Sequence, residues 1–287
     1  MSRAARLVFA CWTIACTGNI AREGGPADES GDAEGVTAGT GGGGPRGGQG
    51  GVGGSGGTSP PAFVPAPARM RRLTVVEYRN SVRDLLGEPV TLPSAVEPDV
   101  VLFGFTSVGA ASSDVSRLGV DRYEKASWTL AAEAMGSETR RRAFLGCAPT
   151  AATDPCVRTF IERFGRRAFR RPLEKAETDG FLGLVSTLAQ TPGNVNLGLE
   201  YVVAAFLQSP SFLYRPEVGR AMEGGQRRFD GWEMASRLSF LFWASGPDDP
   251  LLDAAAAGTL DGVTGIQRES ERLLASPKAR DGLLRFF

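Results

Sequence analysis

The chain has 287 residues, of which 32 are basic and 32 acidic, so its formal net charge is zero. Electrostatic capture of nucleic acid or of an acidic membrane relies on a surplus of basic residues, and the balance argues against nucleic acid as a partner. The chain has no histidine, which excludes serine triads, histidine-containing zinc sites and haem attachment through CxxCH within these residues.

The first residues have the pattern of an export signal. Arg3 and Arg6 precede a short apolar run, 7–15, that is too short to span a bilayer. The run ends in Thr-Ile-Ala-Cys, which resembles a bacterial lipobox and predicts lipidation of Cys16. Thr13 stands where a lipobox usually has leucine, so ordinary signal-peptidase cleavage and a plain signal anchor stay open as alternatives.

Residues 17–69 predict a disordered linker. They are rich in glycine and proline and have too few apolar side chains to bury a core. A flexible coil of roughly fifty residues spans about 35 to 40 Å, which is enough to hold a domain clear of a membrane surface.

The first predicted helix spans 71–87. Thr74 and Glu77 have the spacing of a capping box, and Gly87 is a stop signal. After a stretch without helical period, with at most a short strand near 100–105, helical spacing returns over 116–135.

Two acidic residues lie in the irregular stretch, Glu97 and Asp99. Paired carboxylates can serve acid/base chemistry, as in a hydrolase that needs no histidine. Loop acids beside prolines are also typical of solvated turns, and we favour that interpretation.

Cys147 and Cys156 are predicted to form a disulfide. Exported proteins fold in an oxidising compartment, where two close cysteines pair more often than they bind metal, and their spacing matches neither CxxC nor a zinc pattern. Two free thiols are the alternative in a reducing compartment.

Four arginines, Arg166, Arg167, Arg170 and Arg171, follow a helix that Asp154 and Pro155 are predicted to begin. They are candidates for contact with an anion or a partner. The alternative, which we favour, is that they cover a helix end and pair with nearby glutamates: Glu162, Glu174 and Glu177.

The stretch 230–258 has the clearest helix signals in the chain. Asp230 and Glu233 form a second predicted capping box, and the following residues are apolar on all sides, which is typical of a buried helix. A second helix is predicted to begin with Asp249 as its cap and Pro250 in its first turn. Three nearby acids lack the spacing of a calcium loop, so no metal site is predicted there: Asp248, Asp249 and Asp253.

These patterns predict a mainly α fold, a multi-helix orthogonal or bundle-like array that follows the tether. We call its parts the first, second and third modules. The predicted organisation along the chain is a signal peptide 1–16, the linker 17–69, the first module 70–136, the second module 147–222 with the disulfide, and the third module 229–287.

Four phrases in the chain resemble, in order and wording, planctomycete- and myxobacterial-type lipoprotein modules of unknown function. The phrases are RRLTVVEYRNSVRDLLG, FIERFGRRAFRRPL, SPSFLYRPE and DGWEMASRLSFLFWASGPDDPLLDAAAAGTL. The modules they resemble are domains of unknown function 1587, 1595 and 1592, which accompany planctomycete cytochrome c domains. The resemblance implies no catalytic residue. It implies that haem is bound only in cytochrome-like modules, which are expected downstream of Phe287. It also implies that the third module is incomplete in this chain.

The leading functional hypothesis from the resemblance and the export signal is a lipid-anchored envelope protein, the non-haem part of a cytochrome-associated assembly. Its predicted partners are the membrane, through the lipid, and a cytochrome-type or envelope protein. An envelope polymer- or protein-binding scaffold is the alternative, and a carboxylate-based hydrolase is a third. No cofactor is expected in this chain.

Overall fold

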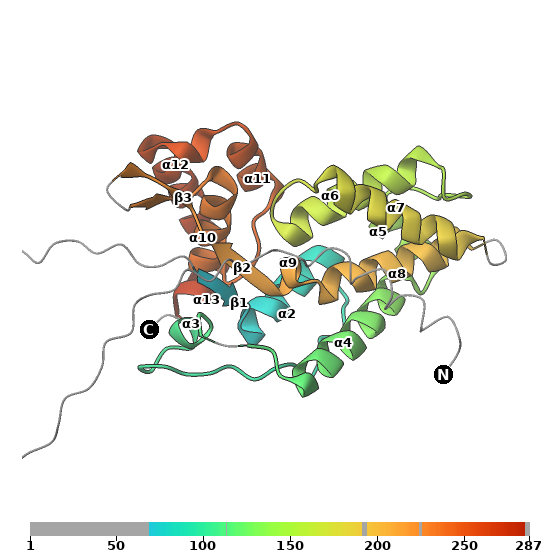
Figure 1. Ribbon diagram of the computed structural model, residues 1–287, viewed down its shortest axis with the longest axis horizontal. Helices are drawn as coiled ribbons and strands as arrows, with labels where there is room; N and C mark the ends of the chain where they lie inside the picture. The colour runs from blue at the N-terminus through green and yellow to red at the C-terminus, as the bar shows by residue number, and fades with distance from the viewer. Residues whose placement is uncertain (1–68, 113, 191–193, 224–225, 285–287) are drawn as a thin grey trace, which may run out of the picture. The chain divides into compact units, whose positions relative to one another are not determined.

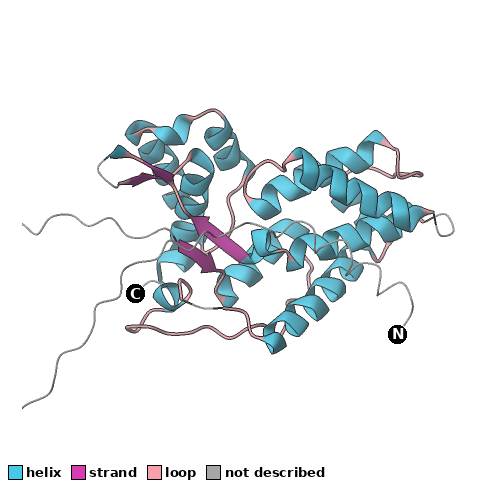
Figure 2. Cartoon of the chain, viewed as in Figure 1, coloured by secondary structure: helices cyan, strands magenta, loops and turns pink. Residues whose placement is uncertain are grey.

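The structure is a computed structural model that describes residues 69–284, except for 113, 191–193 and 224–225. The predicted signal peptide, the lipidation site Cys16 and all but the last residue of the predicted linker lie outside the described residues. The described part is mainly helical, as Figure 2 shows, and the predicted fold class is confirmed.

The first module begins with a short strand and contains two longer helices. The Thr74 hydroxyl accepts from the Glu77 N–H at 3.2 Å, and the Glu77 carboxylate accepts from the Thr74 N–H at 2.8 Å, which confirms the predicted capping box. The elements are β1 (Arg69–Arg72), α2 (Val75–Leu86), α3 (Thr106–Gly109) and α4 (Arg117–Met135).

A tight turn lies between α2 and α3 and exposes a phenylalanine. Leu102 and Phe105 exchange backbone hydrogen bonds of 3.2 and 2.9 Å across the two residues between them. Phe103 and Gly104 both have positive φ, 52° and 83°, as a two-residue hairpin turn of type I′ requires. The bond between Leu102 and Phe105 is an isolated bridge, so the short strand allowed near 100–105 is not formed. Phe103 is 91% exposed.

We expect Phe103→Asn to raise the free energy of unfolding by about 1 kcal/mol, because the left-handed backbone is costly for phenylalanine and tolerated by asparagine. The change removes little packing, since the ring is exposed. Urea unfolding of the two proteins measures the difference. An unchanged or lower stability would mean that Phe103 makes a stabilising contact in solution.

The second module consists of helices packed around an aromatic core. Figure 1 shows α7 and α8 side by side, and the hypothetical Cβ of Gly198 would lie 2.9 Å from the Cα of Val185, so this close approach depends on glycine. The elements are α5 (Glu138–Leu145), α6 (Pro155–Phe169), α7 (Lys175–Ala189), α8 (Val195–Gln208), α9 (Pro210–Leu213) and β2 (Tyr214–Glu217).

A two-stranded antiparallel sheet connects the first and second modules. Arg69 pairs with Glu217 and Arg72 with Tyr214. Helices α4 and α8 also pack against each other, and the buried residues of both modules form one hydrophobic core. The strands β1 and β2 were not predicted, because four-residue strands rich in arginine and proline carry no alternating apolar pattern.

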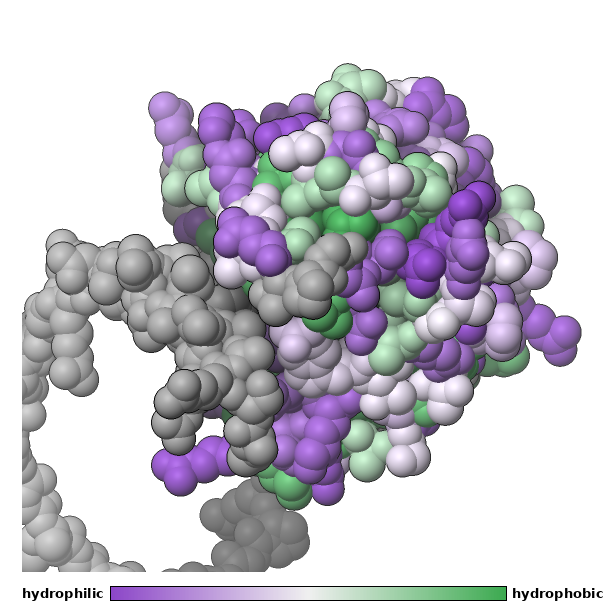
Figure 3. All heavy atoms as spheres, turned by 90° about the vertical axis from the view of Figure 1, so that its right-hand side faces the viewer, coloured by the Kyte–Doolittle hydropathy of each residue, from purple (hydrophilic) through white to green (hydrophobic). Residues whose placement is uncertain are grey.

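Figure 3 shows the side of the molecule that lies at the right in Figure 1. Hydrophilic side chains cover much of this face and hydrophobic areas lie between them.

A β-hairpin precedes the third module, which consists of helices. The hairpin strands are β3 (Arg220–Ala221) and β4 (Arg227–Arg228). The elements of the third module are α10 (Gly231–Trp243), α11 (Asp249–Ala256), the 3-10 helix η2 (Thr259–Asp261), α12 (Val263–Leu274) and α13 (Lys278–Leu284). Asp230 and Glu233 form the second predicted capping box, with bonds of 2.8 and 3.1 Å. The cap of α11 is Asp248, one residue before the predicted Asp249.

Helix α10 lies between two hydrophobic cores. Phe240 belongs to the core that the first and second modules share, whereas Leu238 and Trp243 belong to the core of the third module. This position explains why the helix is apolar on several sides. Burial is not complete, because Leu241 is 50% exposed.

Among the described residues, no helix combines the length and the apolar character that a membrane crossing needs.

Candidate functional site

The four arginines between 166 and 171 each have a different set of internal partners. Arg166 forms an ion pair with Asp253 at 2.6 Å, and Arg167 donates to the carbonyl of Asp84 at 2.7 Å. Arg171 makes two bonds of 2.8 Å to the two carboxylate oxygens of Glu177.

The sequence favoured ion pairs between these arginines and nearby glutamates. Among the described residues, Arg171 with Glu177 is the one such pair that forms. Although burial opposes it, the hydrogen bond from Arg171 and that from the Glu174 N–H hold the pKa of Glu177 below its usual range. Anion or partner binding by the four arginines stays a prediction, and their guanidiniums are already engaged within the chain.

Arg170 is the most buried of the four. It is 3% exposed and donates to four backbone carbonyls, those of Ala168, Ser211, Phe212 and Tyr214, at 2.6 to 3.2 Å. Burial, and then the nearby charge of Arg215, lowers the pKa of the Arg170 guanidinium to about 9, so it stays protonated at neutral pH. This arginine satisfies the carbonyls that surround α9 and the start of β2.

A cavity of about 10 Å³ adjoins Arg170, with Ser81 and Asp84 in its lining. A cavity of this size has room for about one water molecule. It is too small to be a ligand site.

The two candidate carboxylates of the irregular stretch are held by the first module. Glu97 accepts from the Ser116 hydroxyl at 2.8 Å. Asp99 accepts from the Val75 N–H at 3.0 Å and lies 3.8 Å from the guanidinium of Arg72. Burial raises the pKa of Asp99, and the Val75 N–H and Arg72 oppose this increase.

These contacts give both carboxylates structural roles: Asp99 covers the N-terminus of α2, and Glu97 contacts the residue that caps α4. Arg72 is 1% exposed and also donates to the carbonyls of Glu97 and Pro98, at 3.1 and 2.7 Å. Hydrolysis by these carboxylates stays a prediction.

The predicted disulfide is formed in the structure. Cys147 and Cys156 are bonded and close a short loop between α5 and α6. Asp154 precedes α6 as predicted, but its carboxylate makes no cap bond to that helix. It accepts from the N–H groups of Thr150 and Ala151, at 2.6 and 3.1 Å, which lowers its pKa.

Two of the three acids near α11 form ion pairs with arginines. Asp248 caps α11 and accepts two bonds from Arg272, at 2.8 and 2.9 Å, whereas Asp253 pairs with Arg166. Among the described residues, no group of three or more acidic, cysteine or histidine residues could hold a metal ion.

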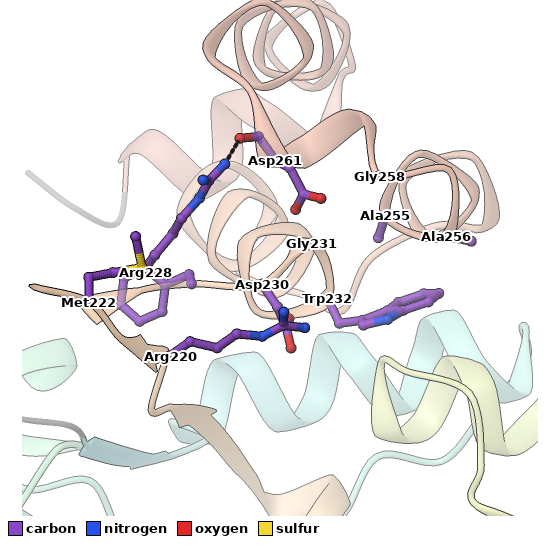
Figure 4. A pocket seen from close by; sticks show the side chains of 11 residues that line it. Arg220, Met222, Arg228, Asp230, Gly231, Trp232, Ala255, Ala256, Gly258 and Asp261 are labelled. Carbon is purple, nitrogen blue, oxygen red and sulfur yellow. Dashed lines mark hydrogen bonds between the residues drawn. The ribbon is translucent and has the colours of Figure 1, made fainter. Parts of the chain in front are cut away.

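A surface cleft that was not predicted lies at the start of α10. Its volume is about 430 Å³, within the roughly 300 to 1,000 Å³ that is usual for small-molecule sites. Figure 4 shows the residues that line it: Arg220, Met222, Arg228, Phe229, Asp230, Gly231, Trp232, Ala255, Ala256, Gly258 and Asp261. They come from the β3–β4 hairpin, the start of α10, the end of α11 and η2.

The hairpin and α10 are fixed to each other by one glutamate. Glu233 Oε1 accepts from the N–H groups of Val218 and Gly219, both at 2.9 Å, while its other oxygen completes the capping box with Asp230. One side chain thus positions the hairpin against the first turn of the helix.

Further contacts fix the other walls of the cleft. Arg228 donates to the carbonyl of Asp261, the bond drawn in Figure 4, and so joins the hairpin to η2. The hypothetical Cβ of Gly231 would lie 3.1 Å from the carbonyl oxygen of Ala255, so glycine allows α10 and α11 to approach closely.

The two aromatic residues of the cleft have cationic neighbours. The guanidinium carbon of Arg237 lies 4.5 Å from the ring centre of Phe229, and that of Arg166 lies 5.8 Å from Trp232. These contacts hold the rings in place.

Several polar groups of the cleft are available for a ligand. Among the described residues, the guanidinium of Arg220 and the carboxylate of Asp261 have no hydrogen-bond partner, and the cap bond uses only one carboxylate oxygen of Asp230. The cleft therefore offers donors and acceptors beside apolar surface.

The sequence contains a weak signal for this cleft. Three arginines, a phenylalanine and a tryptophan occur within 220–232 around a predicted helix start, but no spacing among them indicates a shared site. The sequence does not show that residues 255–261 fold back and place η2 beside the hairpin, and the cleft depends on this contact.

Comparison with known families finds three that match the chain, one after another. Each is described as a protein of unknown function: DUF1587 over residues 71–136, DUF1595 over 156–217 and DUF1592 over 229–287. The order is the one that the resemblance predicted. No curated protein matches the chain, and no solved structure matches it either.

Proposed function

The chain carries a DUF1587, a DUF1595 and a DUF1592 module in this order. We propose that it is an exported, lipid-anchored protein of the cell envelope, on the outer membrane or facing the periplasm. Its helical modules are the non-haem part of a redox- or cytochrome-associated assembly. The observation that carries the proposal is the order of the modules, since in the lipoproteins that this chain resembles these modules accompany cytochrome domains.

Attachment to the membrane rests on the sequence before the folded part. Arg3 and Arg6, the apolar run and Cys16 form a lipobox-like signal, and the glycine-rich linker would then separate the lipid from the first module. Stable attachment needs more than one acyl chain, because a single chain binds only weakly.

Cys16→Ala is expected to abolish lipid labelling and to shift the protein out of the membrane fraction. The measurement is incorporation of labelled palmitate in a bacterial host, followed by fractionation. Cys11→Ala is the matched control, because Cys11 lies within the predicted signal and its removal leaves labelling intact. Labelling that survives Cys16→Ala, or a wild-type protein that is never labelled, would contradict lipidation at this residue.

The assembly itself is tested by its haem content. The tagged full-length gene product, purified from envelopes of its own cells in mild detergent, is expected to carry a haem-staining band, either on its own polypeptide or on a copurified one. Envelope preparations that yield the protein without any haem-staining band would contradict the assembly.

A scaffold that binds an envelope polymer is the second candidate function, and the cleft at the start of α10 favours it. The cleft combines small-ligand volume with aromatic and polar side chains, and the Arg220 guanidinium has no hydrogen-bond partner within the part of the chain that the structure describes. This function does not require a cytochrome partner.

A further inference from the structure

We infer that the cleft at the start of α10 binds a neutral saccharide, such as a short stretch of a polysaccharide. The inference deepens the polymer-binding function proposed above and rests on it only for the source of the saccharide.

The charged side chains of the cleft balance. Two arginines, Arg220 and Arg228, stand with two aspartates, Asp230 and Asp261. Such a lining attracts neither a polyanion nor a cation by its net charge. The balance favours a ligand that is polar and uncharged.

The polar side chains of the cleft include both donors and acceptors. Guanidiniums only donate hydrogen bonds and carboxylates only accept them, whereas a hydroxyl group does both. Neighbouring hydroxyls on a sugar ring can accept from Arg220 or Arg228 and donate to Asp261 or Asp230.

The apolar side chains give a surface for the face of a sugar ring. Met222, Phe229 and Trp232 line the cleft, and the C–H groups of a sugar ring can pack against such side chains. Large aromatic side chains contribute contact area with little loss of conformational freedom. Because Arg237 and Arg166 hold the two rings, little ordering remains to be done on binding.

A zwitterionic ligand such as a free amino acid also has both charges, but it fits less well. Arg220, Arg228 and Asp261 are exposed, and ion pairs at exposed positions contribute little. Recognition would then depend on the apolar walls and on hydrogen bonds, which suit a sugar better than a small charged molecule.

The test is a titration of the full chain with three neutral trisaccharides, cellotriose, maltotriose and triacetylchitotriose, followed by calorimetry and saturation-transfer NMR. At least one is expected to bind. Arg220→Ala and Asp261→Ala are each expected to weaken that binding by about tenfold or more, since each removes a hydrogen bond to a charged group.

Arg117→Ala is the matched control. Arg117 is exposed on α4 and lies outside the cleft, so its removal is expected to leave binding unchanged. Thermal unfolding of each variant shows whether it is folded as the parent is.

Three results would overturn the inference: no trisaccharide binds, a trisaccharide binds equally well to both cleft variants, or the cleft binds inorganic phosphate or free glutamate in place of a sugar. The proposed lipid anchor has a separate test. Unlabelled Cys16 would leave saccharide binding unaffected, and absence of saccharide binding would leave the anchor and the cytochrome assembly standing.

Discussion

Arg170→Ala is expected to lower the free energy of unfolding by about 3 to 5 kcal/mol, because it leaves buried polar groups without partners. The arginine is 3% exposed, and its guanidinium is the donor to four carbonyls around α9. Alanine cannot replace any of these bonds. The measurement is urea unfolding followed by circular dichroism.

The backbone does not account for the expected loss. Arg170 has a φ of 60°, and alanine at this position bears the same left-handed strain as arginine. Arg170→Gly removes that strain as well as the side chain, so it should be somewhat more stable than Arg170→Ala and still far less stable than the parent.

Arg171→Ala is the control for charge alone. Arg171 is adjacent in sequence, but its bonds to Glu177 are partly exposed, and removal of such a pair costs about 1 kcal/mol or less. Equal losses in the two alanine variants would contradict a structural role for Arg170 that depends on its burial.

Phe206→Ala is expected to cost about 3 to 5 kcal/mol, as is usual for loss of a buried phenylalanine. Phe206 is fully buried at the centre of the shared core. Its ring centre lies 5.4, 5.1 and 4.0 Å from those of Phe164, Phe169 and Phe181. Differential scanning calorimetry and urea unfolding both report the loss.

The matched control makes the same change at the most exposed phenylalanine. Phe103→Ala removes a ring that is 91% exposed, so no loss of stability is expected. A Phe206 variant that is as stable as the Phe103 variant would mean that α6, α7 and α8 do not enclose this ring in solution.

Helix ends were predictable because their signals are local. The capping boxes at Thr74 and Asp230 involve residues three positions apart, and both are formed as predicted. Helix α5 was missed although Ser137 caps it and Gly146 ends it in a left-handed conformation. Its exposed, arginine-rich sequence has only one buried residue, Leu145, and therefore little apolar periodicity.

The disulfide was also predictable, since its argument needed only the spacing of Cys147 and Cys156 and the compartment that the signal sequence implies. Of the partners of the four arginines, only Glu177, which pairs with Arg171, was predicted. Arg166 pairs with Asp253 and Arg170 with carbonyls that lie more than forty residues further along the chain. Such contacts depend on tertiary packing, which no local pattern contains.

The cleft could not be predicted for the same reason. Its walls come from segments on either side of α10, and Arg228 joins them by a bond to Asp261. The sequence predicted the capping box of Asp230 and Glu233. It did not predict that Glu233 also accepts hydrogen bonds from the N–H groups of Val218 and Gly219. The chain thus places its candidate ligand site where a well-marked helix begins.

The most direct test of the ligand site is amide hydrogen exchange of the full chain with and without the trisaccharide that binds. Slower exchange is expected only in the cleft segments, 218–223, 226–232 and 255–261, with the first module and the second module up to 217 unchanged. Protection that appears elsewhere, or a bound trisaccharide that protects none of these segments, would contradict a saccharide site in this cleft.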